Sequence, residues 1–343
     1  MGKDKIAIFP IFLPFLGCPF KCIYCNQLLV SKANSFDTLK KVVPQVKKFL
    51  QHNIDKQKEI AFYGGTFTNL SKREMSQVFE TFSDFVPKDV CFRISTRPDC
   101  IDKAKIKFLK SHNVDTIELG VQSFSDRVLE ASKRGYSSST AIKACKLVIS
   151  CGLKLTIQLM PFLPSFSADS LTKTIKTTKS ISPDFVRIYP CLVLKDTKLE
   201  KLYFSGSYTA PSLKETIEVV GKMKHEFENA GIKVIKVGLH SDISEKPENV
   251  VAGGYHPRFG EMVKTFLLKK KILSCRGFSD TLFVSHKDLH LFRLDGHHLT
   301  KELNKQIGEF RIKGDKRLKS GNFYFKKVVG DTGFEPVTST MST

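Results

Sequence analysis

Residues 17–27 read GCPFKCIYCNQ and place Cys18, Cys22 and Cys25 in the pattern C-x-x-x-C-x-x-C. Thiolates this close in sequence indicate a metal site, and they suit three irons of a cubane 4Fe-4S cluster. No fourth cysteine follows at ferredoxin spacing, so one iron would be open to a substrate or cofactor. Two alternatives are a zinc site, which prefers four protein ligands, and a chance cluster of small buried thiols.

Length and composition indicate one large α/β domain with a smaller appendage. The 343 residues are 41% hydrophobic and 26% charged, and no apolar run is long enough to span a membrane. The apolar N-terminal stretch is broken by Pro10 and Pro14 and runs directly into the cysteine motif, which argues against a cleaved signal peptide. The remaining cysteines are scattered, as in proteins of reducing compartments. We therefore expect a cytoplasmic protein with no membrane partner.

The formal net charge of +21 favours a polyanionic partner. Basic residues cluster at 269–271 (KKK) and at 311–319 (RIKGDKRLK). This pattern favours tRNA or another RNA as a partner. The alternative is a lysine-rich surface that is solvated and binds nothing in particular.

Strand-like and helix-like segments alternate through most of the chain, which predicts a parallel sheet built from βα units. The fold class is therefore α/β, a partial (β/α)6 TIM-like barrel with a small C-terminal α+β appendage. We expect the core at 1–238, the appendage at 239–329 and a disordered tail at 330–343. The predicted strands are 5–13, 59–63, 90–95, 115–121, 154–160 and 184–189, with a further strand at 233–237. The predicted helices are 38–52, 71–85, 103–112, 126–132, 139–151, 212–230, 260–268 and 300–307.

Polar residues and glycines stand where several predicted strands end. Gly64 and Gly65 follow the second strand, and a glycine pair lets the backbone approach a ligand closely. The other strand ends carry polar side chains. In β/α barrels the catalytic residues lie at the carboxyl ends of the strands, so these side chains are candidate site residues. They are Ser95, Arg97, Gln122, Gln158 and Arg187.

These motifs together resemble radical S-adenosylmethionine (SAM) enzymes. The cysteine motif has an aromatic residue, Tyr24, before its last cysteine, as in that family. The other motifs are similar to the subgroup that contains the radical domain of the Elongator catalytic subunit and oxygen-independent coproporphyrinogen oxidase. They read GGTFT (64–68), STRPD (95–99), ELGVQSF (118–124), KRGYS (133–137) and IQLMPFLP (157–164).

The resemblance implies both cofactors and the residues that hold them. Cys18, Cys22 and Cys25 would bind a 4Fe-4S cluster whose open iron is chelated by SAM. Reductive cleavage of SAM would give a 5'-deoxyadenosyl radical that abstracts hydrogen from substrate, with electrons from a flavodoxin- or ferredoxin-like donor. The residues implied to line the cofactor site are Tyr24, Gly64, Gly65, Thr66, Ser95, Gln122, Arg134 and Gln158.

Three functions are compatible with this reading. The first is a radical SAM enzyme acting on tRNA, although the residues after Gly231 are too few for the acetyltransferase half of the Elongator subunit. The second is a radical oxidase of porphyrinogens or another small molecule. The third is a non-catalytic iron-sulfur or RNA-binding scaffold. Four histidines are close in sequence, but their spacings match no metal-ligand motif, so exposed histidines are favoured over a second metal site: His286, His290, His297 and His298.

Overall fold

The computed structural model describes most of the chain and divides it into two compact units. The division falls after Pro257, so the units are residues 1–257 and 258–343. The predicted domain boundary at residue 238 stays a prediction, and the predicted tail lies outside the described residues. The described residues are 6–19, 21–26, 37–52, 57–238, 247–275, 277–293 and 298–327.

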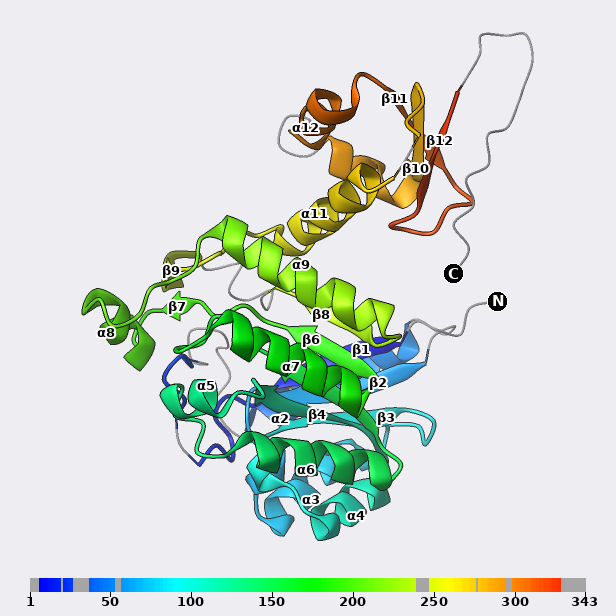
Figure 1. The fold of residues 1–343 in the computed structure, drawn as a ribbon. Helices are drawn as coiled ribbons and strands as arrows, with labels where there is room; N and C mark the ends of the chain where they lie inside the picture. The colour runs from blue at the N-terminus through cyan, green and yellow to red at the C-terminus, as the bar shows by residue number, and fades with distance from the viewer. Residues whose placement is uncertain are drawn as a thin grey trace. The chain divides into compact units, whose positions relative to one another are not determined.

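The N-terminal unit is built on a seven-stranded parallel sheet that curls into a partial barrel (Figure 1). Its order is β1-β2-β3-β4-β5-β6-β8, so β8 follows the six predicted strands at one edge. This confirms the predicted α/β partial barrel, and the further strand predicted at 233–237 joins its sheet as β8. The strands are β1 (Ala7–Phe12), β2 (Lys58–Tyr63), β3 (Cys91–Thr96), β4 (Val114–Gln122), β5 (Lys154–Leu159), β6 (Phe185–Ile188) and β8 (Lys233–Val237).

Helices connect the strands and cover the outer side of the sheet (Figure 1). Capping boxes start three of them, because the side chains of Ser71, Ser167 and Ser212 accept from the backbone N–H three residues ahead. The helices are α2 (Asp37–Gln51), α3 (Lys72–Ser83), α4 (Lys103–Ser111), α5 (Asp126–Ala131), α6 (Ser138–Ser150), α7 (Ala168–Ile181), α8 (Lys198–Phe204) and α9 (Leu213–Asn229). Short 3-10 turns η1 (Phe67–Asn69), η2 (Pro98–Cys100) and η3 (Pro247–Asn249), and the antiparallel pair β7 (Val193–Leu194) and β9 (Val250–Ala252), complete the unit.

Helix α7 was not predicted from the sequence. Its buried face carries Leu171 and Ile175, but Ser170, Thr174 and Thr178 fill the other buried positions. The apolar periodicity that identifies an amphipathic helix is therefore weak in this segment. Thr178 satisfies its buried hydroxyl by donating to the carbonyl of Thr174, one turn earlier.

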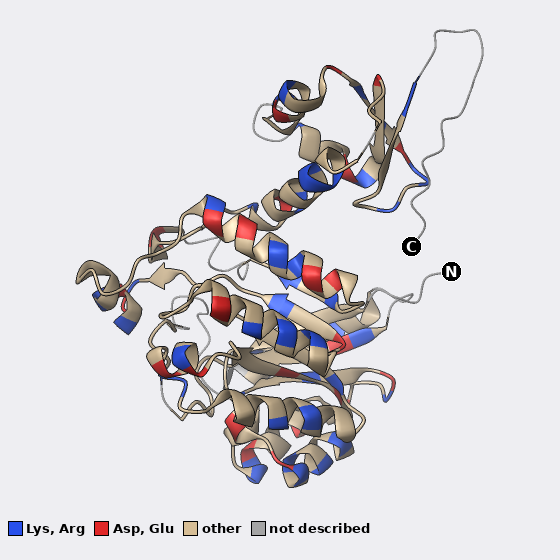
Figure 2. Cartoon of the chain, in the orientation of Figure 1, with Lys and Arg blue, Asp and Glu red and all other residues tan. Residues whose placement is uncertain are grey.

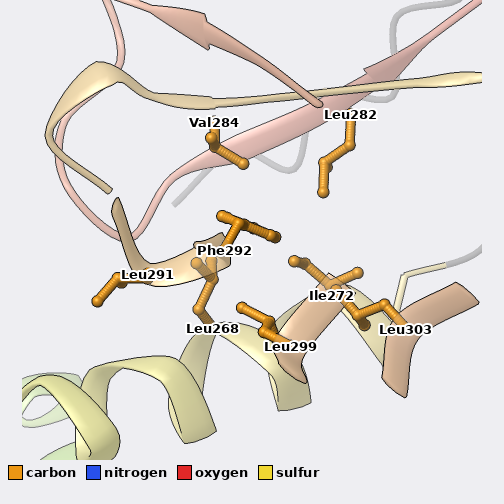
Figure 3. Packing of buried hydrophobic residues seen from close by; sticks show 8 residues of the cluster. All are labelled: Leu268, Ile272, Leu282, Val284, Leu291, Phe292, Leu299 and Leu303. Carbon is orange, nitrogen blue, oxygen red and sulfur yellow. The ribbon is translucent and has the colours of Figure 1, made fainter. Parts of the chain in front are cut away.

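The C-terminal unit packs helices against one face of a three-stranded sheet. Strand β10 lies in the middle, parallel to β11 and antiparallel to β12. Figure 3 shows Leu282 and Val284 of β10 pointing toward Leu268, Ile272 and other apolar side chains of the helices. The elements are α11 (Phe259–Leu273), β10 (Thr281–Ser285), η4 (His286–Phe292), α12 (His298–Ile307), β11 (Arg311–Asp315) and β12 (Phe323–Lys326).

Two whole-chain features bear on function. None of the described helices combines the length and apolar character needed to cross a bilayer. Lys and Arg are distributed over the helices of the first unit as well as the second (Figure 2). Net charge therefore does not by itself locate a binding surface.

Candidate functional site

The cysteine loop is held against the turn after β2 by backbone contacts that require glycine. A Cβ on Gly65 would lie 2.2 Å from the Leu16 carbonyl oxygen, and one on Gly17 would lie 2.4 Å from the Thr66 carbonyl oxygen. The Thr66 N–H donates to the Leu16 carbonyl at 2.8 Å, and Asn69 Nδ2 donates to the Gly17 carbonyl at 2.8 Å. The two loops therefore form one fixed assembly at the carboxyl edge of the sheet.

A cavity of about 230 Å³ opens at this edge. The last residues of the first four strands all line it: Phe12, Tyr63, Thr96 and Gln122. The structure thus brings together every residue predicted for the cluster and the cofactor, although their roles stay predictions. Those lining residues are Cys18, Cys22, Tyr24, Cys25, Gly64, Gly65, Thr66, Ser95, Gln122, Arg134 and Gln158.

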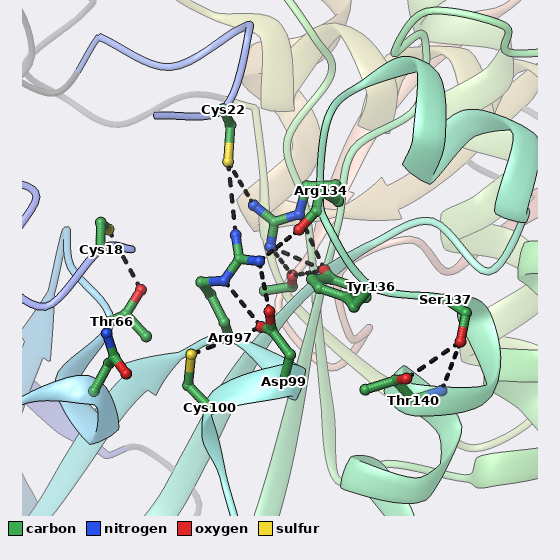
Figure 4. A network of polar contacts seen from close by, with 12 residues as sticks. Cys18, Cys22, Thr66, Arg97, Asp99, Cys100, Arg134, Tyr136, Ser137 and Thr140 are labelled. Atoms are coloured by element: carbon green, nitrogen blue, oxygen red, sulfur yellow. Dashed lines mark hydrogen bonds and ion pairs between the residues drawn. The ribbon is translucent and has the colours of Figure 1, made fainter. Parts of the chain in front are cut away.

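Two arginines face the middle cysteine of the motif (Figure 4). Arg134 Nη1 lies 2.9 Å from Cys22 Sγ and 3.0 Å from the Tyr24 hydroxyl. Arg97 Nη1 lies 4.0 Å from the same sulfur, and its guanidinium donates two hydrogen bonds to Asp99 at 2.9 and 2.8 Å. Positive charge beside a sulfur stabilises an anionic metal-thiolate site.

Arg134 is fixed by a network that the sequence does not reveal. Its side chain is buried and donates to the Gly120 carbonyl at 2.6 Å and to the Tyr136 hydroxyl at 2.9 Å. Tyr136 in turn donates to the Gly120 carbonyl at 2.8 Å. Burial raises the pKa of Tyr136, and Arg134 opposes this shift. The phenol therefore stays protonated and keeps the guanidinium oriented toward the cysteine loop.

Cys18 has a different environment from Cys22. Its sulfur lies 3.3 Å from Thr66 Oγ1. Burial raises the pKa of the Cys18 thiol, while the hydrogen bond to Thr66 lowers it in part. Because metal ligands must be deprotonated, binding a metal at Cys18 would release a proton.

A buried ionic network lies beside the cavity, and three of its members, Tyr63, Glu118 and Tyr189, line the cavity. Arg187 Nε lies 2.8 Å from Glu118 Oε2, and the Arg187 guanidinium donates to the hydroxyls of Tyr63 at 2.6 Å and Tyr189 at 3.0 Å. Desolvation raises the pKa of Tyr63, so its hydroxyl stays protonated. Arg187 was predicted only as a strand-end residue, and Glu118 was missed because it lies inside β4. The strand order of the sheet, in which only β5 separates β4 from β6, brings the two together.

The residues present fit an iron-sulfur cluster with a bound cofactor. Gln122 is 6% exposed, lines the cavity, and has no hydrogen-bond partner for Oε1 within the described part of the chain. Its φ of 67° is a strained conformation of the kind found at ligand sites. An orphaned buried acceptor beside three thiols suits a polar ligand near a metal site.

A mononuclear zinc site suits this geometry less well. Across the described ranges, no group of three His, Cys, Asp or Glu converges on a point where one ion could bind. A cubane cluster spreads its cysteine ligands over different irons, so it needs no such convergence. His286, His290 and His298 are exposed and belong to no such group of described residues, whereas His297 lies outside the described residues.

Comparisons with known proteins were made against this geometry. The Radical SAM superfamily profile matches residues 12–178, and the Radical_SAM C-terminal domain profile matches residues 183–269. An uncharacterized protein of Methanocaldococcus jannaschii is 30% identical over 233 residues, which are 64% of this chain and 71% of that protein.

Two further matches come from Methanocaldococcus infernus. Its tRNA uridine(34) acetyltransferase is 33% identical over 192 residues, which are 54% of this chain and only 34% of that enzyme. The solved structure of its Elp3, with an N-terminal deletion, superposes with a TM-score of 0.62 at 24% identity. That superposition covers 80% of this chain and 66% of the other, and it shows a shared fold.

Proposed function

Because the chain belongs to the radical SAM superfamily, whose members are enzymes that use a 4Fe-4S cluster and SAM, we propose that it cleaves SAM reductively and abstracts hydrogen from a tRNA. The observation that carries the proposal is the single cavity in which three cysteine thiols meet the Gly64-Gly65-Thr66 turn. A reduced 4Fe-4S cluster held by Cys18, Cys22 and Cys25 would supply the electron for the cleavage of SAM to methionine and a 5'-deoxyadenosyl radical.

The residues around the cysteine loop would hold and orient the cluster. Cys18, Cys22 and Cys25 would each supply one thiolate. Arg134 and Arg97 place positive charge against Cys22 and would offset the negative charge of the thiolates. A flavodoxin- or ferredoxin-like protein in the cytoplasm would deliver the electron.

The strand ends would hold the cofactor. Gly64 and Gly65 have no Cβ, so the cofactor could approach their backbone closely beside the cysteine loop. Tyr24, Thr66, Ser95, Gln122 and Gln158 supply polar groups around the same cavity, and Gln122 Oε1 is buried without a donor inside the described ranges. Glu118 lines the cavity and is already paired with Arg187, so this pair would keep its position when the cofactor binds.

The tRNA substrate is supported by charge and by relatives. A net charge of +21 attracts polyanions over long range. The similar enzyme of Methanocaldococcus infernus carries tRNA uridine in its name, but this chain spans 34% of it. Acetyl transfer is therefore not part of the proposal, which is limited to the radical step.

The test uses reconstituted protein under anaerobic conditions with dithionite, SAM and unmodified tRNA. We expect tRNA to stimulate SAM consumption and nucleoside mass spectrometry to find a changed nucleoside. The Cys22→Ala variant should give neither result, while the matched Cys151→Ala variant, which changes a cysteine that does not line the cavity, should behave as wild type. SAM cleavage that porphyrinogens stimulate and tRNA does not would contradict the substrate assignment.

A further inference from the structure

Helix α8 follows β7 (Figure 1) and packs on the cysteine loop. The Leu199 N–H, in the first turn of α8, donates to the Ile23 carbonyl at 2.8 Å. Just before the helix, the Lys195 carbonyl accepts a hydrogen bond from Asn26 Nδ2 at 3.0 Å. Ile23 and Asn26 lie on either side of Cys25 in the sequence. Hydrogen bonds therefore join α8 to the segment that would hold the cluster.

The side of α8 that faces the loop is apolar. Leu199 is buried, and Leu202 and Tyr203 pack against the same group of side chains, which also includes Cys22 and Cys25. An α-helix with its side chains is about 10 Å across. A molecule that contacts the far side of α8 would therefore lie within about one helix diameter of the cysteine loop.

The far side of α8 carries two lysines and a phenylalanine. Lys198, Lys201 and Phe204 follow one another at a spacing of three residues, which places them on adjoining turns of one face. Both lysines are exposed, as is Lys195 just before the helix. None of these three lysines forms an ion pair with a described carboxylate. Phe204 is 71% exposed, more than any other large hydrophobic side chain in the described ranges.

Two carboxylates stand among these lysines. Asp196 is exposed, and the Glu200 carboxylate accepts a hydrogen bond from the Asp196 N–H at 3.0 Å. An RNA backbone carries only negative charge, so phosphates along α8 would also meet both carboxylates. A protein can oppose each charge with its opposite, and an aromatic side chain within a polar rim is typical of protein interfaces. The composition of this surface therefore favours a protein partner over RNA.

The charge of the chain favours a partner with an acidic surface. A net charge of +21 accelerates the approach of an acidic protein, and the three exposed lysines give that protein a local contact. Electron-transfer proteins associate through small interfaces. The exposed side of a seven-residue helix offers an interface of this kind.

We propose that the α8 surface, formed by Lys195, Lys198, Lys201 and Phe204, docks an acidic flavodoxin-like protein that reduces the cluster. In this step the flavin hydroquinone anion of the partner gives one electron to the oxidised cluster and becomes the neutral semiquinone. No bond forms or breaks, and no proton is transferred. The need for an electron donor rests on the proposed function, whereas the surface itself rests on the packing of α8 against the cysteine loop.

The experiment measures binding of a fluorescently labelled bacterial flavodoxin to the full, reconstituted chain by anisotropy at low and high salt. Lys198→Glu/Lys201→Glu should weaken binding at low salt by about tenfold or more and reduce its salt dependence. Phe204→Ala should weaken binding about tenfold at both salt concentrations, as expected for loss of an aromatic anchor. The matched control is Lys143→Glu/Lys146→Glu on α6, which reverses two exposed lysines of the same unit and should bind nearly as wild type.

Stopped-flow absorbance separates docking from assembly of the cluster. Flavodoxin hydroquinone should reduce the cluster of Lys198→Glu/Lys201→Glu and of Phe204→Ala more slowly than that of wild type or of the α6 control. Dithionite is a small reductant that needs no docking surface, so it should reduce all four proteins at the same rate. Slower reduction of the α8 variants by dithionite as well would show that α8 only supports the loop, and would overturn the docking assignment.

Two further results would also overturn it. The first is equal flavodoxin affinity of Lys198→Glu/Lys201→Glu and the α6 control. The second is tRNA binding that Lys198→Glu/Lys201→Glu abolishes while flavodoxin binding persists, which would assign the surface to RNA. Failure of the proposed function has a different signature, because flavodoxin would then reduce the wild-type cluster without any cleavage of added SAM. In that case the docking assignment stands.

Discussion

The N-terminal unit places ionic side chains inside its sheet, whereas the C-terminal unit places them on an open face. Glu59 and Arg93 pair at 2.8 Å with side-chain exposures of 0% and 1%. Arg311 and Lys313, on a sheet that helices cover on one side, are exposed. In the N-terminal sheet, which helices cover, a buried charged side chain needs a partner of opposite charge, because an unpaired buried ion is very costly. The Glu59–Arg93 pair is therefore preorganised, whereas Arg311 and Lys313 remain exposed to solvent.

Breaking the buried pair should have the largest effect on stability. Glu59→Ala leaves the Arg93 guanidinium buried without its carboxylate, and we expect the free energy of unfolding to fall by about 3–5 kcal/mol. Urea denaturation measures this change. The double variant Glu59→Leu/Arg93→Met removes both charges and should recover much of the loss. A single variant as stable as wild type would show that the pair is not desolvated.

The next prediction concerns the backbone contact of the cysteine loop. In Gly65→Ala the new Cβ meets the Leu16 carbonyl, so the loop must move, with a cost of about 1–3 kcal/mol. We expect the iron content after reconstitution to fall as well. Gly308→Ala in the C-terminal unit adds a methyl group with no atom within 4 Å. That variant should keep its iron, and equal iron content in both variants would contradict the fixed loop assembly.

Alkaline pH should weaken the N-terminal unit through a buried thiol. Burial raises the pKa of Cys145 from its ordinary value near 9 to about 12. The folded state then holds a proton that the unfolded state loses, so stability is complete below about pH 9 and falls as pH rises toward 12. The slope from this group is at most about 1.4 kcal/mol per pH unit. Cys145→Ala should flatten the denaturation profile in this range, and Cys275→Ala, in the other unit, should not.

The smallest effect is expected for an exposed ion pair of the C-terminal unit. Lys269 Nζ lies 2.7 Å from Glu302 Oε2, with side-chain exposures of 25% and 38%. Solvent screens such pairs, so Glu302→Gln should change the free energy of unfolding by less than about 1 kcal/mol. Urea denaturation in low and high salt checks this. If Glu302→Gln lowered the free energy of unfolding as much as Glu59→Ala, the buried and exposed ion pairs of the two units would not differ in their contribution to stability.

Local sequence patterns predicted the scaffold well. Aliphatic runs identified the strands that helices and neighbouring strands bury. The capping box predicted from Ser71 and Glu74 is also confirmed. The α/β partial barrel and the family resemblance are also confirmed. The resemblance depends on short motifs, and the cavity brings those motifs together because each lies at a strand end.

The remaining features depend on contacts between distant segments. Arg97 was only one of several polar strand-end residues, and nothing local indicates that it binds Asp99 and faces Cys22. Tyr136 was quoted only within a motif, yet it orients Arg134. Helix α7 was missed because serine and threonine fill three of its five buried positions. Hydrophobic periodicity identifies apolar faces. It does not identify buried polar side chains whose hydrogen-bond partners come from distant segments of the chain.

The central claim is that the cysteine loop and the adjoining strand ends form one SAM-cleaving site. The most direct measurement is the yield of 5'-deoxyadenosine from reconstituted protein with dithionite and SAM, in wild type, Cys22→Ala and the control Cys151→Ala. We predict product from wild type and Cys151→Ala and none from Cys22→Ala. The claim is contradicted if wild type carries a cluster but makes no product, or if Cys22→Ala makes as much as wild type.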